Sequence, residues 1–333
     1  MNDRAVNVLE QYDMEVTRTY KGRGVIICDT SDGLRVLKEY RGKAEKLELL
    51  DELQHNMSHI AKTDMLVRNK EGELFVKDAD GVTYIVKEQL EGRECNYKSE
   101  EDVVQAFRTM STLHLAMVRQ LTPEKDYGMT FHYYVDEMEK HTRECKHVRN
   151  YLRKLKNKTD FERELLRKYD YFLEQAVRIT DEAKKEDREV YEEFVNENGL
   201  FCHGDFQYHN VLISRNGVSI INLERFARES GVKDFYLLFR KISEKSEWSA
   251  SLADKMLDAY QTHRPFHELE WRQLYYRLSY PDKFWKIVNF YYNYKKSWIP
   301  GRNMEKLESL VNQEKAKQRL LCNIFGNYSE LSR

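Results

Sequence analysis

One short segment of the sequence holds the residue types that transfer of a phosphoryl group needs. The segment HGDFQYHN covers residues 203–210. Asp205 would accept, or at least orient, the proton of an attacking hydroxyl, and Asn210 would offer its side-chain carbonyl to a Mg²⁺ that bridges nucleotide phosphates. His203 is expected to pack beneath this loop and to hold its backbone by hydrogen bonds. A His-x-Asp with an asparagine five residues beyond the aspartate is the spacing of a phosphotransfer loop.

A β-hairpin follows this loop and strengthens the interpretation. The β-like stretch 199–226 interrupts a helical region and continues from the loop through VLIS, a turn at 215–217 and SIIN. The second strand ends in the polar residue Asn222, twelve positions after Asn210. A loop of this spacing that leads into such a hairpin is a much stronger signal than the loop alone.

The residues before about position 90 predict a small β-rich lobe. Five strands are indicated by β-branched and aromatic residues between turns: 13–20, 24–29, 34–40, 72–78 and 82–88. A helix is indicated over 43–61 by apolar residues at three- and four-residue steps, among them Leu47, Leu50, Met57 and Ile60. The order β-β-β-α-β-β predicts a twisted antiparallel sheet with one helix packed across it.

The rest of the chain is mostly helical. From about residue 99 to 198 it is highly charged, and its blocks of alternating sign are typical of the solvated faces of amphipathic helices. Helices resume after 226. The pattern predicts an α+β fold of two lobes, a β-rich lobe over 1–90 and a larger helical lobe over 91–333 that contains the hairpin 199–226.

Composition excludes several classes of partner. The 55 Lys and Arg residues against 56 Asp and Glu leave a formal net charge of −1, which gives no reason to expect nucleic acid or an anionic membrane as a partner. No apolar run reaches the roughly 18 residues of a membrane span, and the first residues lack the pattern of a signal peptide. The five cysteines are widely spaced and never form CxxC, so we expect a reduced chain without structural zinc.

The loop and hairpin, HGDFQYHNVL…IINLE, resemble the core of the aminoglycoside-phosphotransferase and choline-kinase-like branch of the protein-kinase fold. More narrowly, nearly the whole chain is similar to the CotS-type spore coat proteins of endospore-forming bacteria, and the aromatic stretch 280–307 is comparable to one in their clostridial members. The resemblance implies a bilobal kinase-like fold with a nucleotide cleft between the lobes. It also implies ATP and Mg²⁺ as cofactors, neither of them required for the structure.

The same resemblance assigns roles in phosphate binding. Lys38, in VLKEY, matches the strand lysine that holds the α- and β-phosphates, and a carboxylate of the following helix should pair with it. Sequence does not choose among Glu45, Glu48 and Glu52 for this pairing, and Glu48 is taken as the candidate.

Three further matches concern the nucleotide and the loop. Gly22 and Gly24, in KGRG, lie where a phosphate-covering turn would be, although a β-turn that needs positive φ is the simpler explanation for them. Gln89 and Leu90 would offer backbone groups to an adenine as the hinge. Asp234 matches an aspartate that braces the catalytic loop, and its alternative role is that of a helix N-cap.

The chain departs from the family at one metal ligand. The family has an aspartate at the end of the hairpin strand, where this chain has Asn222, in Ile-Asn-Leu-Glu. A neutral amide cannot supply the anionic charge that favours Mg²⁺, and a loss of roughly 3–4 kcal/mol would slow transfer by two to three powers of ten. If the strand stays extended, Glu224 lies on the same face as Asn222 and could lend the missing carboxylate.

Other candidate sites have simpler explanations. His55 and His59 have the spacing of a two-histidine metal site but lack the glutamate of HExxH, so a solvated helix face is expected. His263 and His267 share that spacing, but Pro265 between them argues against a helix. The aromatic stretch is expected to close the helical lobe, with a partner-docking surface as the alternative; its residues are Phe284, Trp285, Phe290, Tyr291, Tyr292, Tyr294 and Trp298.

These observations predict a spore-coat-associated protein that binds nucleotide weakly, with weak or no phosphotransfer. It would be made in the mother-cell cytoplasm and deposited on the spore, with other coat proteins as partners. The alternative is an active ATP-dependent kinase that phosphorylates a hydroxyl of a sugar, choline-like or aminoglycoside substrate with Asp205 as base. A protein kinase is disfavoured because no DFG or APE motif follows the hairpin.

Overall fold

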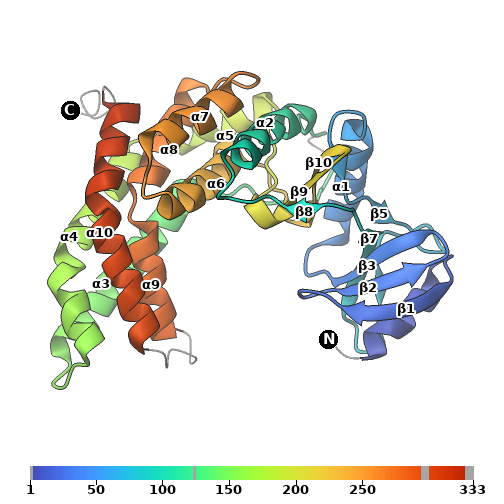
Figure 1. Cartoon of the computed structure of the whole chain (residues 1–333), viewed down its shortest axis with the longest axis horizontal. Helices are drawn as coiled ribbons and strands as arrows, with labels where there is room; N and C mark the ends of the chain where they lie inside the picture. Colours follow the sequence, from blue (N-terminus) through green and yellow to red (C-terminus); the bar gives the residue numbers. More distant parts are fainter. Residues whose placement is uncertain (1–2, 123–124, 294–299, 327–333) are drawn as a thin grey trace. The chain divides into compact units, whose positions relative to one another are not determined.

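The computed structural model describes residues 3–122, 125–293 and 300–326, which form two compact units. Unit 1 comprises residues 1–130, 196–235 and 259–264, and unit 2 comprises 131–195, 236–258 and 265–333. The fold is α+β, with antiparallel strands in the N-terminal region and helices in the C-terminal region (Figure 1). The predicted lobe boundary near residue 90 stays a prediction.

The first sheet of unit 1 is antiparallel throughout. Its strand order is β1-β2-β3-β7-β5, and β6 also pairs with β7. The strands are β1 (Val16–Lys21), β2 (Ile26–Thr30), β3 (Gly33–Glu39), β5 (Leu66–Val67), β6 (Val76–Lys77) and β7 (Thr83–Glu88). The 3₁₀ helix η1 (Asp3–Gln11) packs Val8 and Leu9 against this sheet. Together with Tyr12, which follows the helix, they form one buried cluster with Ile26 and Leu37.

The second sheet of unit 1 contains the predicted hairpin. Its order is β4-β10-β9-β8, formed by β4 (Lys62–Thr63), β10 (Gly217–Ile220), β9 (Val211–Ser214) and β8 (Arg93–Glu94). Strands β9 and β10 are antiparallel, whereas β4 pairs with β10 in parallel. The short 3₁₀ helices η2 (Tyr208–Asn210) and η3 (Leu223–Arg225) flank the hairpin.

Helices α1 (Ala44–Met57) and α2 (Glu100–Ala116) complete unit 1. Helix α1 buries Leu47, Leu50 and Met57, as its periodicity predicts. It ends at Met57 rather than at Ala61, so Ile60 lies outside the helix and is 49% exposed. The backbone closes this end by a bond from the Ser58 N–H to the carbonyl of His55.

One predicted strand is shorter in the structure, and two short strands were not predicted. Only Val76–Lys77 is a strand within 72–78, because residues 69–73 form a turn in which the Asn69 side chain accepts from the backbone N–H groups of Glu71 and Glu73. The short strands β4 and β5 were not predicted. Two-residue strands are too short to show a period in sequence.

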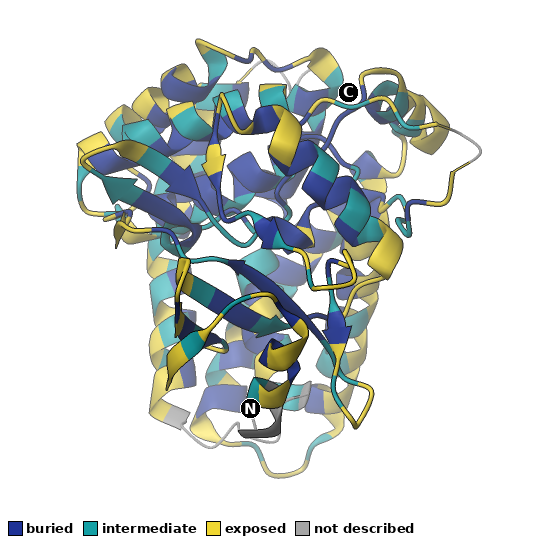
Figure 2. Ribbon diagram, turned by 90° about the vertical axis from the view of Figure 1, so that its right-hand side faces the viewer, coloured by how far each residue is buried: buried dark blue, intermediate teal, exposed yellow. Residues whose placement is uncertain are grey.

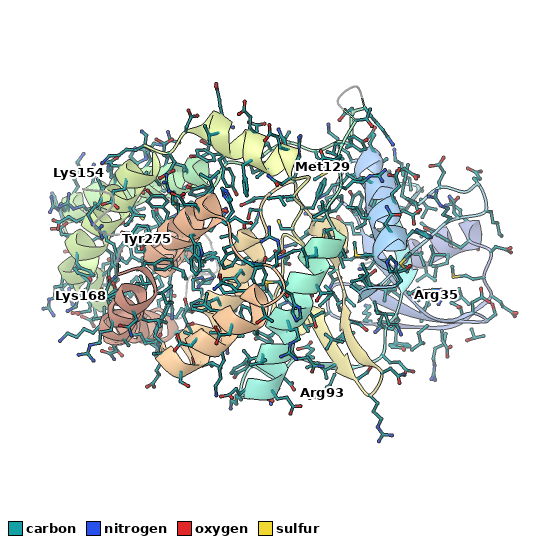
Figure 3. All side chains as sticks on the ribbon, turned by 90° about the horizontal axis from the view of Figure 1, so that it is seen from above. Arg35, Arg93, Met129, Lys154, Lys168 and Tyr275 are labelled. Atoms are coloured by element: carbon teal, nitrogen blue, oxygen red, sulfur yellow. The ribbon has the colours of Figure 1, made fainter. Side chains whose placement is uncertain are left out.

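Unit 2 is helical, as the charged pattern predicts. Its elements are α3 (Tyr134–Lys154), α4 (Asp160–Ala183), α5 (Arg188–Glu197), α6 (Val232–Lys245), α7 (Ala250–Gln261), α8 (Glu268–Ser279), α9 (Asp282–Asn293) and α10 (Pro300–Phe325), of which α5, α6 and α7 each have one end in unit 1. Buried and exposed residues alternate along these helices (Figure 2). Charged residues such as Lys154 and Lys168 project outward from α3 and α4 (Figure 3).

The aromatic stretch contributes to the core of unit 2. Phe284 is 1% exposed and stacks on Phe172 with ring centroids 4.9 Å apart. Trp285 stacks on His141 and donates its indole N–H to Glu144 over 2.7 Å. Phe290 is 37% exposed. Core packing is thus confirmed for Phe284, while Tyr294 and Trp298 lie outside the described residues.

Candidate active site

The loop 203–210 is held by a buried carboxylate. Asp234, in the first turn of α6, is fully buried and accepts hydrogen bonds from the backbone N–H groups of His203 (2.5 Å) and Gly204 (2.9 Å). His114 lies 3.0 Å from the same carboxylate through Nε2. Burial alone would raise the pKa of Asp234, but these hydrogen bonds and the charge of His114 lower it. Asp234 therefore braces the loop and does not act as a helix N-cap.

The conformation of the loop also depends on Gly204 and on a pair of backbone hydrogen bonds where the loop begins. Cys202 and Ala227 exchange two backbone hydrogen bonds of 3.0 Å, which close the segment between them. Gly204 has φ +80°, and a Cβ there would lie 2.2 Å from the carbonyl oxygen of Arg225. Only glycine fits both the left-handed backbone and this close approach.

His203 lies beneath the loop, as its predicted role requires. Its side chain is fully buried; Nε2 lies 2.9 Å from the carbonyl oxygen of Ile221, and Nδ1 accepts from the backbone N–H of Asp205 over 3.2 Å. This pattern requires the neutral tautomer with the proton on Nε2. His203 thus connects the loop to the end of strand β10.

The carboxylate of Asp205 already has two donors. Gln207 donates to Oδ1 over 2.7 Å, and the exposed Arg225 lies 3.2 Å from Oδ2. A hydroxyl that delivers its proton to Asp205 would have to compete with this guanidinium for one of the oxygens.

The first sheet places two lysines on one face. Lys38 of β3 pairs with Ile85 of β7, and Val36 pairs with Lys87. Residues two apart in a strand share a face, and so do directly paired residues, so Lys38 and Lys87 are diagonal neighbours on the same side. Lys87 is 2% exposed, whereas the Lys38 side chain is 26% exposed.

The parallel pair β4–β10 places a carboxylate beside the end of the hairpin. Ile220 pairs with Thr63, so Asp64 follows in register with the residues after β10. Asp64 is 3% exposed and accepts from the Asn222 backbone N–H at 3.2 and 3.0 Å and from Lys87 at 2.6 Å. Gln54 of α1 supports this segment by donating to the Asp64 carbonyl over 2.9 Å.

Asn222 turns the chain shortly after the end of strand β10. Its φ of 68° and ψ of 42° are left-handed, a conformation that Asn adopts more readily than most residues, and η3 follows directly. The condition under which Glu224 would share a strand face with Asn222, an extended strand from Asn222 to Glu224, is therefore not met. Glu224 nevertheless reaches the site, because the 3₁₀ turn returns its side chain toward Lys38 and Lys87.

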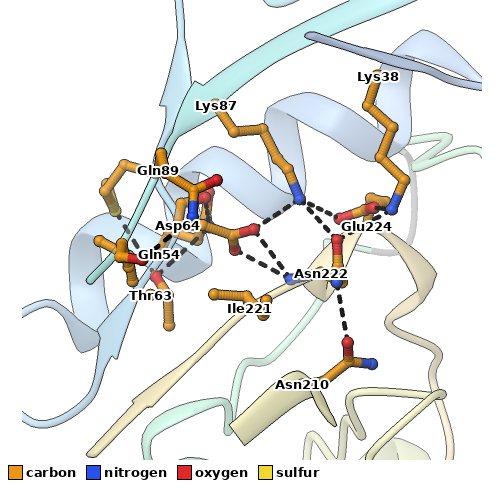
Figure 4. Close-up of polar contacts among 12 residues, drawn as sticks. Lys38, Gln54, Thr63, Asp64, Lys87, Gln89, Asn210, Ile221, Asn222 and Glu224 are labelled. Carbon is orange, nitrogen blue, oxygen red and sulfur yellow. Dashed lines mark hydrogen bonds and ion pairs between the residues drawn. The ribbon is translucent and has the colours of Figure 1, made fainter. Parts of the chain in front are cut away.

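Five side chains converge in what we call the charge cluster: Lys38, Asp64, Lys87, Asn222 and Glu224 (Figure 4). Lys38 bonds one carboxylate oxygen of Glu224, and Lys87 lies 3.1 Å from the other. The Asn222 Oδ1 accepts from both lysines, at 3.0 and 3.1 Å. Two ammonium groups and two carboxylates balance the charge within the cluster.

The pKa values of the cluster follow from these contacts. Burial alone would raise the pKa of Glu224, but the charges of Lys87 and Lys38 and the bond from Lys38 lower it to about 2. Burial would lower the pKa of Lys87, but Asp64 and Glu224 outweigh it and raise that pKa. Burial raises the pKa of Asp64, against the opposing effect of Lys87.

The predicted metal ligands do not fit Mg²⁺. The Asn210 Oδ1 accepts from the Asn222 side-chain amide over 2.9 Å, and the oxygens of Asn222 and Glu224 accept from the two lysines. Mg²⁺ needs near-octahedral oxygen ligands at about 2.0–2.1 Å. A divalent ion about 4 Å from one ammonium would be repelled by roughly 8 kcal/mol at an effective dielectric constant of about 20. Among the described residues, no group of three or more His, Cys, Asp or Glu side chains could hold a metal ion.

The predicted pairing of Lys38 with helix α1 is corrected. Glu48, on α1, bonds Arg68 at 3.1 Å, and Glu52 bonds Arg119 at 2.8 Å. Lys38 is held by Glu224 and Asn222 instead. The carboxylate that pairs with the strand lysine thus comes from the segment after the hairpin.

The predicted nucleotide-binding backbone segments lie at the two ends of the first sheet's strands. Gly22 and Gly24 form the β1–β2 turn, in which the Gly22 N–H donates to Val25 over 2.9 Å and Gly24 has φ +72°. Gln89 and Leu90 directly follow β7; the Gln89 N–H donates to the Leu34 carbonyl over 3.1 Å, and its side-chain amide donates to the Leu90 carbonyl over 3.2 Å.

The remaining candidates have structural roles or none. His55 is on α1, but His59 follows its end, so the two do not share a helix face. His267 caps α8 by accepting from the Leu269 N–H over 3.2 Å. The five cysteines are free thiols, and all except Cys322 are buried. No helix in the described ranges combines the length and apolarity needed to cross a membrane.

Sequence reasoning missed two residues of the charge cluster, Asp64 and Lys87. A signal for Lys87 was present, because this charged residue directly follows the apolar run Tyr84-Ile85-Val86 within a predicted strand. Asp64 had no comparable signal, since strand β4 that positions it has only two residues.

Comparisons with known sequences identify a family and a relative. The family model described as "Spore coat putative kinase YutH" matches residues 5–324. Spore coat protein S of Bacillus subtilis (strain 168) is 22% identical over 327 residues, which cover 93% of this chain and 89% of that protein.

Solved structures share the fold. An aminoglycoside phosphotransferase from Alicyclobacillus acidocaldarius matches with a TM-score of 0.82 and 20% identity, over 98% of this chain and 96% of that one. Spectinomycin phosphotransferase APH(9)-Ia, in complex with ADP and spectinomycin, matches with a TM-score of 0.65 and 12% identity over 96% and 97%. The amicoumacin kinase hAmiN, in complex with AMP-PNP, Ca²⁺ and Ami, matches with a TM-score of 0.64 and 10% identity over 96% of this chain and 94% of that one.

Proposed function

Because the chain belongs to the spore coat putative kinase YutH family, we propose that it is a spore-coat-associated protein whose kinase-like fold binds nucleotide, with weak or no phosphotransfer. The single observation that supports weak or absent phosphotransfer is that lysine side chains occupy the position of the metal. The oxygen of Asn222 and the carboxylate of Glu224 are engaged by two lysine ammonium groups, where a working site would hold Mg²⁺. Without that metal, the developing charge on a triphosphate loses its main stabilisation.

Nucleotide binding is proposed from the groups that remain. Lys38 is partly exposed and can exchange Glu224 for a phosphate oxygen. The backbone groups of Gln89 and Leu90 follow β7 at the position proposed for adenine. The solved structures that share the fold include complexes with ADP and with AMP-PNP. ATP is therefore the nucleotide we propose, with affinity limited by competition from Glu224 for Lys38.

Thermal stability in the presence of nucleotide tests this proposal. The melting temperature should rise with ATP to a similar extent with Mg²⁺ and with EDTA, and no phosphate should pass to a hydroxyl acceptor. Strong stabilisation that requires Mg²⁺, together with phosphate transfer to any hydroxyl, would contradict the proposal. An unchanged melting temperature with every nucleotide tested would contradict the proposed nucleotide binding.

The rival is an active small-molecule kinase, and one observation favours it. The loop that would present Asp205 is held by its own hydrogen bonds: the Asp205 N–H donates to His203 Nδ1 over 3.2 Å, and the Asn210 side-chain amide donates to the Asp205 backbone carbonyl over 2.8 Å. Its acceptor would be a hydroxyl of a sugar, choline-like or aminoglycoside compound, with Asp205 receiving the proton. If the rival holds, Asn222→Asp should raise phosphotransfer above the wild-type rate, with Asp205→Asn as the inactive control.

The proposed location follows from the family alone. We propose synthesis in the mother-cell cytoplasm, deposition on the developing spore, and other coat proteins as partners. Fractionation of mature spores tests this: the protein should be found in the coat extract. Its recovery only from vegetative cytosol would contradict the proposed location without affecting the nucleotide proposal.

A further inference from the structure

Lys87 has the surroundings of a bound cation. Its ammonium lies 2.6 Å from the Asp64 carboxylate, 3.1 Å from the Glu224 carboxylate and 3.1 Å from Oδ1 of the Asn222 side chain (Figure 4). These oxygen atoms come from the β4–β5 connection, from η3 and from the end of β10, respectively. We propose that Lys87 is a built-in substitute for the divalent metal, and that this position excludes Mg²⁺ whether or not Asn222 is restored to aspartate.

Burial and covalent attachment make this lysine different from a mobile counter-ion. Lys87 is 2% exposed and its pair with Asp64 is buried on both sides, with side-chain exposures of 3% and 5%. A buried charge without a partner is strongly unfavourable, so the buried carboxylate of Asp64 needs the Lys87 ammonium, its one ion-pair partner in the cluster. A metal can enter only if Lys87 leaves, and the buried strand β7 gives its side chain no solvated alternative.

Lys38 offers an internal comparison. It bonds the same two side chains, Asn222 and Glu224, but 26% of its own side chain is exposed. Lys38 can therefore turn toward a phosphate while Lys87 stays with Asp64. The two lysines therefore have different roles. Lys38 is available to bind a ligand, and Lys87 occupies the position of the metal cation.

A consequence for the ligand rests on the proposed function. If nucleotide binds here, the phosphates meet ammonium groups rather than a metal, so the binding species is the metal-free nucleotide. Asparagine at position 222 suits a site without a metal. Its side-chain amide donates to Asn210 Oδ1 over 2.9 Å, a hydrogen bond that the carboxylate of an aspartate cannot make.

Manganese binding tests the proposal without any nucleotide. Lys87→Met keeps the side-chain length but removes the charge, leaving Asp64, Glu224 and Asn222 around an uncompensated position. Titration of Mn²⁺, followed by electron paramagnetic resonance, should give binding at least about tenfold tighter for this variant than for the wild type, with a matching rise in melting temperature. Lys38→Met is the matched control, because it removes a cation from the same two side chains and leaves Lys87 in place; it should not gain metal binding.

Each outcome decides the proposal. Equal Mn²⁺ binding by both variants would overturn it, because loss of any positive charge would then explain the effect. No gain in the folded Lys87→Met variant would overturn it as well. If Lys87→Met does not fold, Asn222→Asp carries the test: with Lys87 still present it should bind Mn²⁺ no better than the wild type, and tighter binding would overturn the proposal. Since nucleotide is absent throughout, failure of the proposed nucleotide binding would leave these results unchanged.

Discussion

Glu224→Gln should destabilise the protein, because the substitution removes the carboxylate shared by two lysines. In the wild type, Glu224 is 8% exposed and bonds both Lys38 and Lys87. The variant keeps the shape of the side chain but leaves Lys38 with only the neutral Asn222 and Lys87 with Asp64 and that amide. Removal of one partner from a buried ionic cluster is costly since the remaining charge stays buried.

The magnitude follows from the pKa of Glu224. Its value of about 2, against an ordinary 4.5, corresponds to about 3 kcal/mol of stability at neutral pH. Because the folded-state pKa is the lower one, this stabilisation is complete above about pH 4.5 and is lost as the pH falls toward 2. At about 2–4 °C per kcal/mol, the variant should melt on the order of 6–12 °C lower at pH 7.

Thermal unfolding from pH 7 down to pH 3 measures this effect. The difference between wild type and Glu224→Gln should be largest at pH 7 and should narrow below pH 4.5. Glu39→Gln is the control, because Glu39 pairs with the exposed Arg41 and should change stability by no more than about 0.5 kcal/mol. A variant that melts within about 1 °C of the wild type at pH 7, or a difference that does not depend on pH, would refute the assigned role of Glu224.

Three further substitutions test the loop. Gly204→Ala should destabilise by more than about 2 kcal/mol or prevent folding, because a Cβ would lie 2.2 Å from the Arg225 carbonyl oxygen; wild-type stability in urea unfolding would contradict this. Asp234→Asn should speed hydrogen exchange at the amides of His203 and Gly204, which lose a charged acceptor, and unchanged protection would count against the brace. Arg225→Ala should leave stability within about 0.5 kcal/mol but free one oxygen of Asp205, so that any trace of phosphotransfer rises; an equal or lower rate would mean that the guanidinium does not obstruct the base.

Much of the fold could be predicted because its signals are local. The hairpin, the charged helices of unit 2 and the helix after β3 all show their periods over many residues. The end of α1 was predicted about one turn too late, because Ile60 continues the apolar spacing although the chain has already left the helix. Strands of two residues, such as β4 and β5, carry no period and depend on pairing partners far along the chain.

The candidate site was predictable where a motif covers it. The loop residues Asp205 and Asn210 and the nearby Asn222 follow from spacing, and the strand lysine Lys38 from the resemblance. Their mutual contacts were not predictable in detail, since the sequence does not show that the chain turns at Asn222 with positive φ.

The partner of Lys38 was predicted on the wrong element. The helix α1 offers several acidic residues, but sequence cannot say which arginine competes for them, and Arg68 bonds Glu48. The contribution of Lys87 depends on the register between β3 and β7, which joins residues about fifty positions apart. Such long-range pairings decide the electrostatics of this site.

At the centre of this account, lysine ammonium groups and not a metal contact the side-chain oxygens of Asn222 and Glu224. Anomalous scattering from crystals grown with ADP and Mn²⁺ tests it most directly. The expected map has no manganese within coordination distance of either side chain and retains the bond between Lys87 and Asp64. A manganese ion bound by Asn222 and Glu224 together, with Lys87 displaced, would contradict the claim.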